Sequence, residues 1–314
     1  MECEEENHEW EMGGNIEQVE VELVTGYCAT CGDEEKSNCA SNGHDIINDF
    51  QDDDAADFPD EPQEANEFMK AQIPFIEKAL IIGDAHGNTT FLKLAIEKAK
   101  EQDCDAVIQV GDFGWFPKLP SPVGEKIIRD YDFPVFFIDG NHEDFDDLWQ
   151  YVADEPDKPI IEVRKNLWYI QRGSNIKIGN INCLFIGGAH SIDKVHRVKG
   201  VSWFPQENLR DVDVAKALSH KRVDVVFSHD CPDSINIVHD VHPESIWNRH
   251  RLQSIADKYK MIKWWYFGHY HQPYEKYNYD SCRLYRCMPA DVNDPRKGVV
   301  FNFDENNEEK VVTI

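Results

Sequence analysis

The sequence has no apolar run long enough to cross a membrane, because no stretch approaches the roughly 18 apolar residues that a span needs. It also has little positive charge: 32 Lys and Arg stand against 59 Asp and Glu, and the formal net charge is −27. The first ten residues, MECEEENHEW, are acidic, whereas a secretory signal begins with a basic region. These absences predict a cytoplasmic protein without a membrane partner.

Nine cysteines occur without a signal peptide, so they indicate free thiols or metal ligands rather than a disulfide framework. Cys28 and Cys31 have the C-x2-C spacing of a zinc knuckle, and Cys39 and His44 could complete a tetrahedral site. The second half of this set lacks the usual C-x2-C or H-x3-H spacing. A small structural zinc site at 28–44 is therefore one hypothesis, and a loop with free thiols is the alternative.

Residues 1–70 differ in composition from the rest of the chain. They hold 22 Asp and Glu against two Lys, a net charge of −20, which leaves −7 for residues 71–314. Residues 45–70 are rich in Asp, Glu, Pro and Gln, and such a segment buries too little apolar surface to offset its ordering entropy. We expect an acidic, largely disordered extension over 1–70 and one folded domain over 71–314. A tail that folds over a positively charged site is the functional alternative to a solvating linker.

From residue 75 onward, short apolar runs alternate with helical patterns, such as those at 89–103 and 205–220. Six runs each end in a small or polar residue and are followed by Asp, Asn or His: ALII, DAVIQV, PVFFID, NCLFI, VDVVF and MIKWWYF. This alternation predicts an α/β protein with its site along the carboxyl edge of the strands. The stretch QRGSNIKIGNINCLFIGG predicts instead an antiparallel hairpin that turns at Gly179-Asn180. The sheets should therefore be mixed.

The side chains that follow these strands are suited to metal binding. Each one alone has an ordinary explanation, as a helix cap or a turn residue. Together they are an improbable set of caps, and their carboxylate, carboxamide and imidazole groups suit two divalent ions chosen from Mn, Fe, Zn, Co and Ni. The set consists of Asp84, His86, Asp112, Asn141, His142, His229, His269 and His271.

These residues carry a resemblance to the calcineurin-like metallophosphoesterase superfamily. Its pattern is D-x-H, GD, GNHD or GNHE, a single H, and GH-x-H. The matching blocks, in family order, are DAH at 84–86, GD at 111–112, GNHE at 140–143, His229 and GHYH at 268–271. The sequence is also similar to uncharacterised bacterial and phage metallophosphoesterases in the block GGAHSIDKVHRVKGVSWFPQENL at 187–209 and in an HDCP motif.

The resemblance implies a fold, an activity and a role for each residue of the pattern. The fold would be a four-layer sandwich of two mixed β-sheets flanked by helices. The activity would be hydrolysis of phosphate monoesters or diesters by a hydroxide between two divalent ions. The ligands would be Asp84, His86, Asp112 and His271 for one ion and Asp112, Asn141, His229 and His269 for the other, with Asp112 bridging. His142 would be the outer histidine that assists the leaving group.

Phosphate recognition usually needs further donors. The loop HRVKG makes Arg197 a candidate phosphate contact, with His190 ahead of it, although a surface loop pinned by Trp203 and Phe204 is the alternative. The basic cluster WNRHR at 247–251 is expected on a solvated helix face.

A missing arginine and the acidic composition argue against two classes of substrate, phosphoproteins and nucleic acids. The Arg that phosphoprotein phosphatases carry in GDxxDRG is missing from GDFGWFP, which argues against a protein Ser/Thr phosphatase. The acidic composition argues against broad binding to nucleic acid. A nucleotide or another small phosphate ester is favoured, with a nuclease or a non-catalytic scaffold of the same fold as alternatives.

Cys231 is expected to pack rather than to react, because this chemistry needs no nucleophilic side chain. No oligomeric state is predicted.

Overall fold

The computed structural model describes residues 74–117, 128–237, 242–288, 297–304 and 307–314. The predicted acidic extension at 1–70 and the candidate zinc ligands at 28–44 lie outside these residues.

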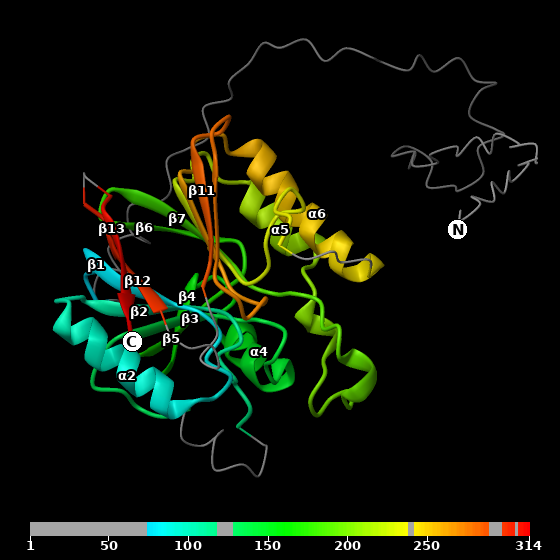
Figure 1. Cartoon of the computed structure of the whole chain (residues 1–314). Coiled ribbons are helices and arrows are strands. Elements are labelled where there is room, and N and C mark those ends of the chain that lie inside the picture. The colour runs from blue at the N-terminus through cyan, green and yellow to red at the C-terminus, as the bar shows by residue number, and fades with distance from the viewer. Residues whose placement is uncertain (1–73, 118–127, 238–241, 289–296, 305–306) are drawn as a thin grey trace, which may run out of the picture. The chain divides into compact units, whose positions relative to one another are not determined.

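The first mixed sheet contains seven strands. They are β1 Lys78–Ile82, β2 Ala106–Val110, β3 Val135–Ile138, β4 Ile160–Arg164, β5 Leu167–Ile170, β12 Lys297–Asn302 and β13 Glu309–Thr313. Their order is β13-β12-β1-β2-β3-β5-β4 (Figure 1). The pairs from β1 through β2 and β3 to β5 are parallel, and the outer pairs are antiparallel. The carboxyl ends of β1, β2 and β3 therefore meet at one edge.

The second mixed sheet contains six strands. They are β6 Ser174–Ile178, β7 Ile181–Ile186, β8 Val225–Ser228, β9 Trp264–Phe267, β10 Tyr274–Asn278 and β11 Arg283–Cys287. Their order is β10-β11-β9-β8-β7-β6, with parallel pairing from β7 through β8 and β9 to β11. The predicted hairpin is confirmed, because β6 and β7 are antiparallel and Ile178 lies opposite Ile181 across the turn. The six predicted apolar runs are β1, β2, β3, β7, β8 and β9.

The helices are α2 Thr89–Glu101, α4 Phe145–Asp154, α5 Asp211–Leu218 and α6 Pro243–Lys258, with short 3₁₀ turns η1 Lys194–His196 and η2 Pro205–Glu207. The helical pattern at 205–220 is thus divided into η2 and α5. The backbone is extended at Asn208 and Arg210, which separates the two helices. At this break the Arg172 guanidinium donates to the carbonyls of Gln206, Glu207 and Asn208, so these carbonyls have partners from outside the segment.

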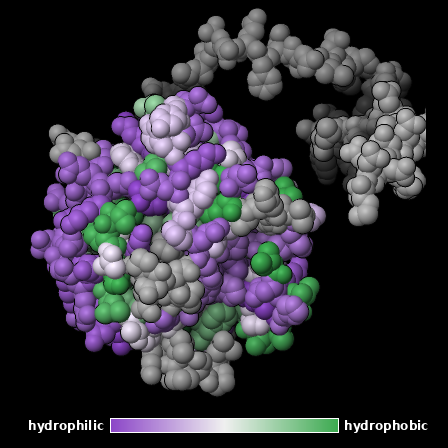
Figure 2. All heavy atoms as spheres, viewed as in Figure 1, coloured by the Kyte–Doolittle hydropathy of each residue, from purple (hydrophilic) through white to green (hydrophobic). Residues whose placement is uncertain are grey.

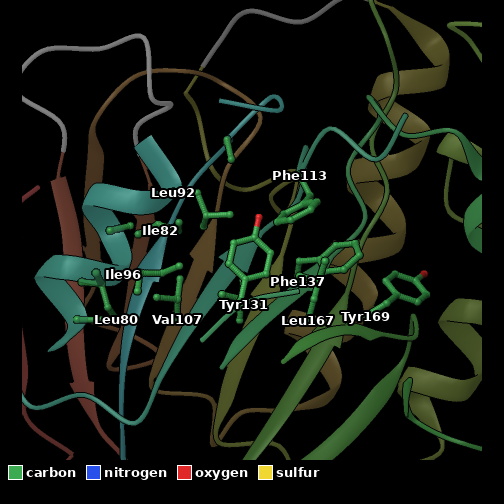
Figure 3. Packing of buried hydrophobic residues seen from close by; sticks show 14 of the residues in the cluster. Leu80, Ile82, Leu92, Ile96, Val107, Phe113, Tyr131, Phe137, Leu167 and Tyr169 are labelled. Atoms are coloured by element: carbon green, nitrogen blue, oxygen red, sulfur yellow. The ribbon is translucent and has the colours of Figure 1, made fainter. Parts of the chain in front are cut away.

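Three apolar layers hold the elements together and confirm the four-layer sandwich. One lies between the first sheet and helices α2 and α4, where Leu80 and Ile82 of β1 pack near Leu92 and Ile96 of α2 (Figure 3). The second lies between the two sheets and the third between the second sheet and helices α5 and α6. Alternate residues of β1 belong to different layers, since Ile81 faces the other sheet. This is the period of two expected of a strand buried on both faces.

One face of the molecule shows how polar and apolar side chains are distributed at the surface. The face drawn in Figure 2 is largely hydrophilic, with apolar side chains in small separate groups. No helix among the described residues combines the length and the apolarity that a membrane span requires.

Candidate metal centre

The predicted metal ligands lie in loops that follow five strands, three from the first sheet and two from the second. The loops after β1, β2 and β3 carry Asp84 and His86, Asp112, and Asn141, and the loops after β8 and β9 carry His229, and His269 and His271. Contacts between the two groups show that the carboxyl edges of the two sheets meet here. His86 and His271 are 185 residues apart in the chain, yet their Nε2 atoms are 2.9 Å apart.

The first group contains four side chains whose ligand atoms all lie within 4.8 Å of one another: Asp84, His86, Asp112 and His271. His86 Nε2 lies 3.6 Å from Asp112 Oδ2, and His271 Nε2 lies 3.8 Å from Asp84 Oδ1. These are the four residues that the sequence assigns to one ion.

The second group surrounds His229. Its Nε2 lies 3.1 Å from Asn141 Oδ1 and 3.3 Å from Asp112 Oδ1, and its ring centroid is 5.2 Å from that of His269. The Asp112 carboxylate therefore turns Oδ2 toward His86 and Oδ1 toward His229. One carboxylate faces both groups, as a bridging ligand would have to.

Hydrogen bonds from the backbone fix how these side chains are presented. His229 Nδ1 lies 2.9 Å from the Val110 carbonyl, which can accept only from a protonated Nδ1, so Nε2 is left facing the cluster. The amides of Asn141 and His142 donate to Asp112 Oδ1 at 2.8 and 2.7 Å.

One buried polar atom shows that a cation fits the cluster. Asp84 Oδ1 accepts a hydrogen bond from the His269 amide at 2.8 Å. Asp84 Oδ2 is also buried, but it has no hydrogen-bond partner among the described residues. A buried carboxylate oxygen without a partner is costly, and a divalent ion among imidazole and carboxylate donors would satisfy it.

Four of the predicted ligands have left-handed backbone conformations. The φ angles are 45° at His86, 53° at Asp112, 69° at His269 and 50° at His271. Each such residue costs about 1–3 kcal/mol, and strain of this kind concentrates at functional sites. The sharp turns direct side chains from successive strand ends toward one point. Asp and His adopt such angles more often than most residues, but this weak preference does not identify the individual positions.

Two glycines of the motifs are required by close approach. A Cβ atom on Gly140 would lie 2.0 Å from Asp112 Oδ1, and a Cβ atom on Gly268 would lie 2.7 Å from Asp84 Oδ2. Only glycine lets the backbone pass this close to the two carboxylates.

Burial and neighbouring charges shift the pKa values of the Asp and His side chains in the cluster in different directions. Burial raises the pKa of Asp84. Burial acts in the same direction on Asp112, but His229 and His142 outweigh it, so the Asp112 pKa lies well below its usual range. Burial disfavours the charged form of His229, but Asp112 and Asp84 raise its pKa to about 10. Burial lowers the pKa of His269 to about 4. A metal ion bound at His229 would therefore have to displace a proton from it.

His142 lies beside the first group. Its ring contacts the His86 ring edge-on, with centroids 5.2 Å apart. Burial lowers the pKa of His142, so the imidazole is neutral near pH 7 and can donate or accept one hydrogen bond at each nitrogen.

Arg197 lies in a hydrogen-bonded network with Asn141, and its contact with phosphate stays a prediction. Its guanidinium donates to the Asn141 carbonyl at 3.1 Å and to the Ser191 hydroxyl. It also lies 3.5 Å from the Glu207 carboxylate. Ser191 in turn accepts a hydrogen bond from Asn141 Nδ2 at 2.9 Å. Sequence analysis identified Arg197 but missed Ser191 and Glu207, which no motif distinguishes from ordinary loop residues.

The Glu143 side chain stabilises the loop that follows β2 through hydrogen bonds to its backbone. Its carboxylate accepts hydrogen bonds from the amides of Phe113, Gly114 and Trp115 at 2.7, 3.0 and 2.5 Å. Burial raises the Glu143 pKa to about 8. The fourth letter of GNHE thus supports the backbone that directly follows Asp112, a role that its position in the motif does not reveal.

Three further sequence expectations have structural outcomes. Cys231 is fully buried in the apolar layer under α6, as expected of a packing residue. The expectation that WNRHR lies on a solvated helix face is wrong for Arg249, which is buried and donates to the carbonyls of Pro232, Asp233 and Ile235. His190 is also buried and lies against α6, where its ring stacks on that of His242.

Comparison with known proteins adds a family assignment. Residues 77–273 match the sequence model of a family described as calcineurin-like phosphoesterase. No curated protein matches the chain.

Solved structures of similar fold have low sequence identity to this chain. An archaeal phosphodiesterase is 13% identical, with a TM-score of 0.37 over 76% of this chain and 99% of that one. A dimetal phosphatase from Danio rerio is 13% identical, with a TM-score of 0.43 over 77% of this chain and 99% of that one. A 5′-nucleotidase from Candida albicans is 14% identical, with a TM-score of 0.38 over 77% of this chain and 52% of that one.

Proposed function

Since the chain belongs to the calcineurin-like phosphoesterase family of metal-dependent hydrolases, we propose that its cluster of carboxylates and imidazoles is a dinuclear centre that hydrolyses a small phosphate ester. The observation that carries this proposal is the position of Asp112. Its two oxygens face two different imidazoles, Oδ2 toward His86 at 3.6 Å and Oδ1 toward His229 at 3.3 Å. A carboxylate has two oxygens and can serve both sides, whereas an imidazole offers one free nitrogen at a time.

The proposed ligands are those of the two groups around Asp112. One ion would be held by Asp84, His86, Asp112 and His271, and the other by Asp112, Asn141, His229 and His269. When bound, two divalent ions would neutralise the phosphate and lower the pKa of a water molecule for in-line attack. The donor set suits Mn²⁺ and the other transition metals that accept both nitrogen and oxygen ligands.

Side chains of the protein would orient the proposed ligands and would supply a hydrogen bond or a proton to the leaving oxygen. Asn141 Nδ2 donates to Ser191, so the amide oxygen is turned toward His229 and the second ion. His142 has a pKa lowered by burial and lies beside His86 at the margin of the cluster. We assign to it a hydrogen bond to the leaving oxygen of the ester, or a proton from its less populated imidazolium form.

Three basic side chains between residues 194 and 210 have acidic partners, which favours a small substrate over a nucleic acid. Arg197 faces Glu207 at 3.5 Å, Lys194 faces Glu244 at 3.4 Å, and Arg210 faces Asp213 at 2.6 Å. Cations that already have acidic partners leave little free charge for a polyanionic backbone.

The test is hydrolysis of p-nitrophenyl phosphate and its bis ester with added Mn²⁺. The Asp112→Asn variant should lose at least ~10²-fold in kcat/KM, because both ions lose a shared anionic ligand. Asp132→Asn is the matched control, since Asp132 is an exposed carboxylate whose partner is Lys100. If Asp112→Asn hydrolyses both esters as well as Asp132→Asn does, the proposal is wrong. The ratio of the two rates in wild type assigns the enzyme to monoesters or diesters.

A further inference from the structure

A second group of metal-ligating side chains lies outside the proposed dinuclear centre. It consists of His190, His242 and Glu244, whose ligand atoms all lie within 4.8 Å of one another. His190 lies in the loop after β7, His242 is the residue before α6, and Glu244 lies in the first turn of that helix.

The three side chains converge from two separate segments. His190 Nδ1 lies 3.1 Å from Glu244 Oε2. The rings of His190 and His242 stack with centroids 4.3 Å apart and an interplanar angle of 22°. His190 is only 1% exposed, so one ligand is held firmly by the interior, whereas the Glu244 side chain is 47% exposed. The exposed side chains can therefore rotate to complete a coordination shell around a fixed imidazole.

We propose that His190, His242 and Glu244 bind a further divalent ion, with Zn²⁺ preferred. Two imidazoles and one carboxylate are a set that Zn²⁺ uses when a fourth position is left to water. Mg²⁺ and Ca²⁺ prefer all-oxygen ligands, so they fit this set less well. Zinc bonds of about 2.0–2.2 Å require the three ligand atoms to close in and the exposed His242 ring to turn out of its stack on His190.

One neighbouring cation competes for the same carboxylate. Lys194 Nζ lies 3.4 Å from Glu244 Oε2, but the Lys194 side chain is 37% exposed. Exposed ion pairs contribute only about 0–1 kcal/mol, so a coordinated Zn²⁺ would displace this lysine.

The ion would fasten the loop after β7 to the start of α6. The residue after His190 is Ser191, which accepts from Asn141 Nδ2 at 2.9 Å and donates to Glu207 Oε2 at 3.0 Å. The site therefore adjoins the support of a proposed ligand without sharing any residue with the dinuclear centre. We assign it a stabilising role for this loop, which does not depend on the proposed hydrolase activity.

The test compares Zn²⁺ content in four full-length proteins after equilibration with Zn²⁺ and removal of free metal. They are wild type, His242→Ala, Glu244→Gln and the matched control His250→Ala, whose exposed histidine lies on the same helix and faces Asp233. The two site variants should each contain about one equivalent less than the control, because three ligands are the minimum for a zinc site of this kind. Ions bound elsewhere cancel in the comparison. The increase in Tm caused by Zn²⁺ should also be smaller in both site variants than in the control.

Two results would overturn the proposal. If both site variants hold as much Zn²⁺ as His250→Ala, no ion binds at these residues. If they lose more than one equivalent while circular dichroism shows a folded protein, the three residues are not an independent site. Glu244→Gln keeps the size of the side chain, so a folding defect in His242→Ala alone does not decide the question.

Discussion

Replacing Gly140 with Ala should place a methyl group against the carboxylate on which the proposed centre depends. The Cβ atom would lie 2.0 Å from Asp112 Oδ1 and 2.3 Å from the Asp112 amide nitrogen. The Asp112 backbone is held, since its carbonyl accepts from the His86 amide at 2.8 Å. Asp112 as a whole therefore has to move against this hydrogen bond, and with it the carboxylate that faces both His86 and His229.

The expected size of the effect follows from the overlap. Relief of these contacts needs a displacement of roughly 1 Å, and a misplacement of that size at a reacting centre costs on the order of 10²-fold in rate. The assay is kcat/KM for p-nitrophenyl phosphate, together with metal content. Gly200→Ala is the control, because nothing lies within 4 Å of its Cβ position, although its φ of +75° costs stability. If Gly140→Ala is folded, binds metal and keeps wild-type kcat/KM, the position assigned to Asp112 is wrong.

Three further variants test separate parts of the account. His142→Asn should retain its metal but lose ~10²–10⁴-fold in kcat, and less with good leaving groups, whereas equal losses for all leaving groups would indicate charge stabilisation instead of proton donation. Burial raises the Glu207 pKa to about 7 from an ordinary 4.5, so between these values the folded state keeps a proton that the unfolded chain releases. The protonated Glu207 therefore contributes stability that is fully present below about pH 4.5 and lost as pH rises through 7. The free energy of unfolding in urea should therefore fall for wild type relative to Glu207→Gln by about 1.4 kcal/mol per pH unit between about pH 4.5 and 7. A difference between the two proteins that does not change with pH would refute this. Arg172→Met should lower the free energy of unfolding by about 3–5 kcal/mol, because it leaves Asp139 buried without the guanidinium 2.6 Å away, and a loss below 1 kcal/mol would contradict the structure.

The sequence predicted those parts of the fold that depend on local periodicity. The six apolar runs became strands because each alternates between two buried faces, and the turn at Gly179-Asn180 closed the expected hairpin. The four-layer architecture and the grouping of the ligands were predicted through the family resemblance and the rule that parallel strands end at one edge. That rule groups the predicted ligands within each sheet, and the meeting of the two carboxyl edges brings His86 and His271 together across 185 residues.

What the sequence did not predict depends on contacts between distant segments. The burial of Arg249 follows from three carbonyls in the loop at 232–235, which no helix periodicity reveals. The approach of Ser191 and Glu207 to Asn141, and of His190 to α6, likewise arises only after the sheets pack.

The sequence also did not predict the left-handed backbone conformations of the proposed ligands. Left-handed φ angles are uncommon for any single Asp or His, although these types adopt them more often than most residues, so the surrounding structure must select them at four proposed ligands.

The central claim is that two ions share Asp112, and electron paramagnetic resonance of the Mn²⁺-loaded protein tests it most directly. Metal-depleted full-length protein would be titrated with Mn²⁺ while phosphate-ester hydrolysis is followed. We predict that activity returns with the spectrum of an exchange-coupled Mn²⁺ pair, because two ions joined by one carboxylate lie about 3.5–4 Å apart. Asp112→Asn should show neither the coupled spectrum nor the activity. Full activity with only isolated Mn²⁺ ions, or a coupled and active Asp112→Asn protein, would contradict the account.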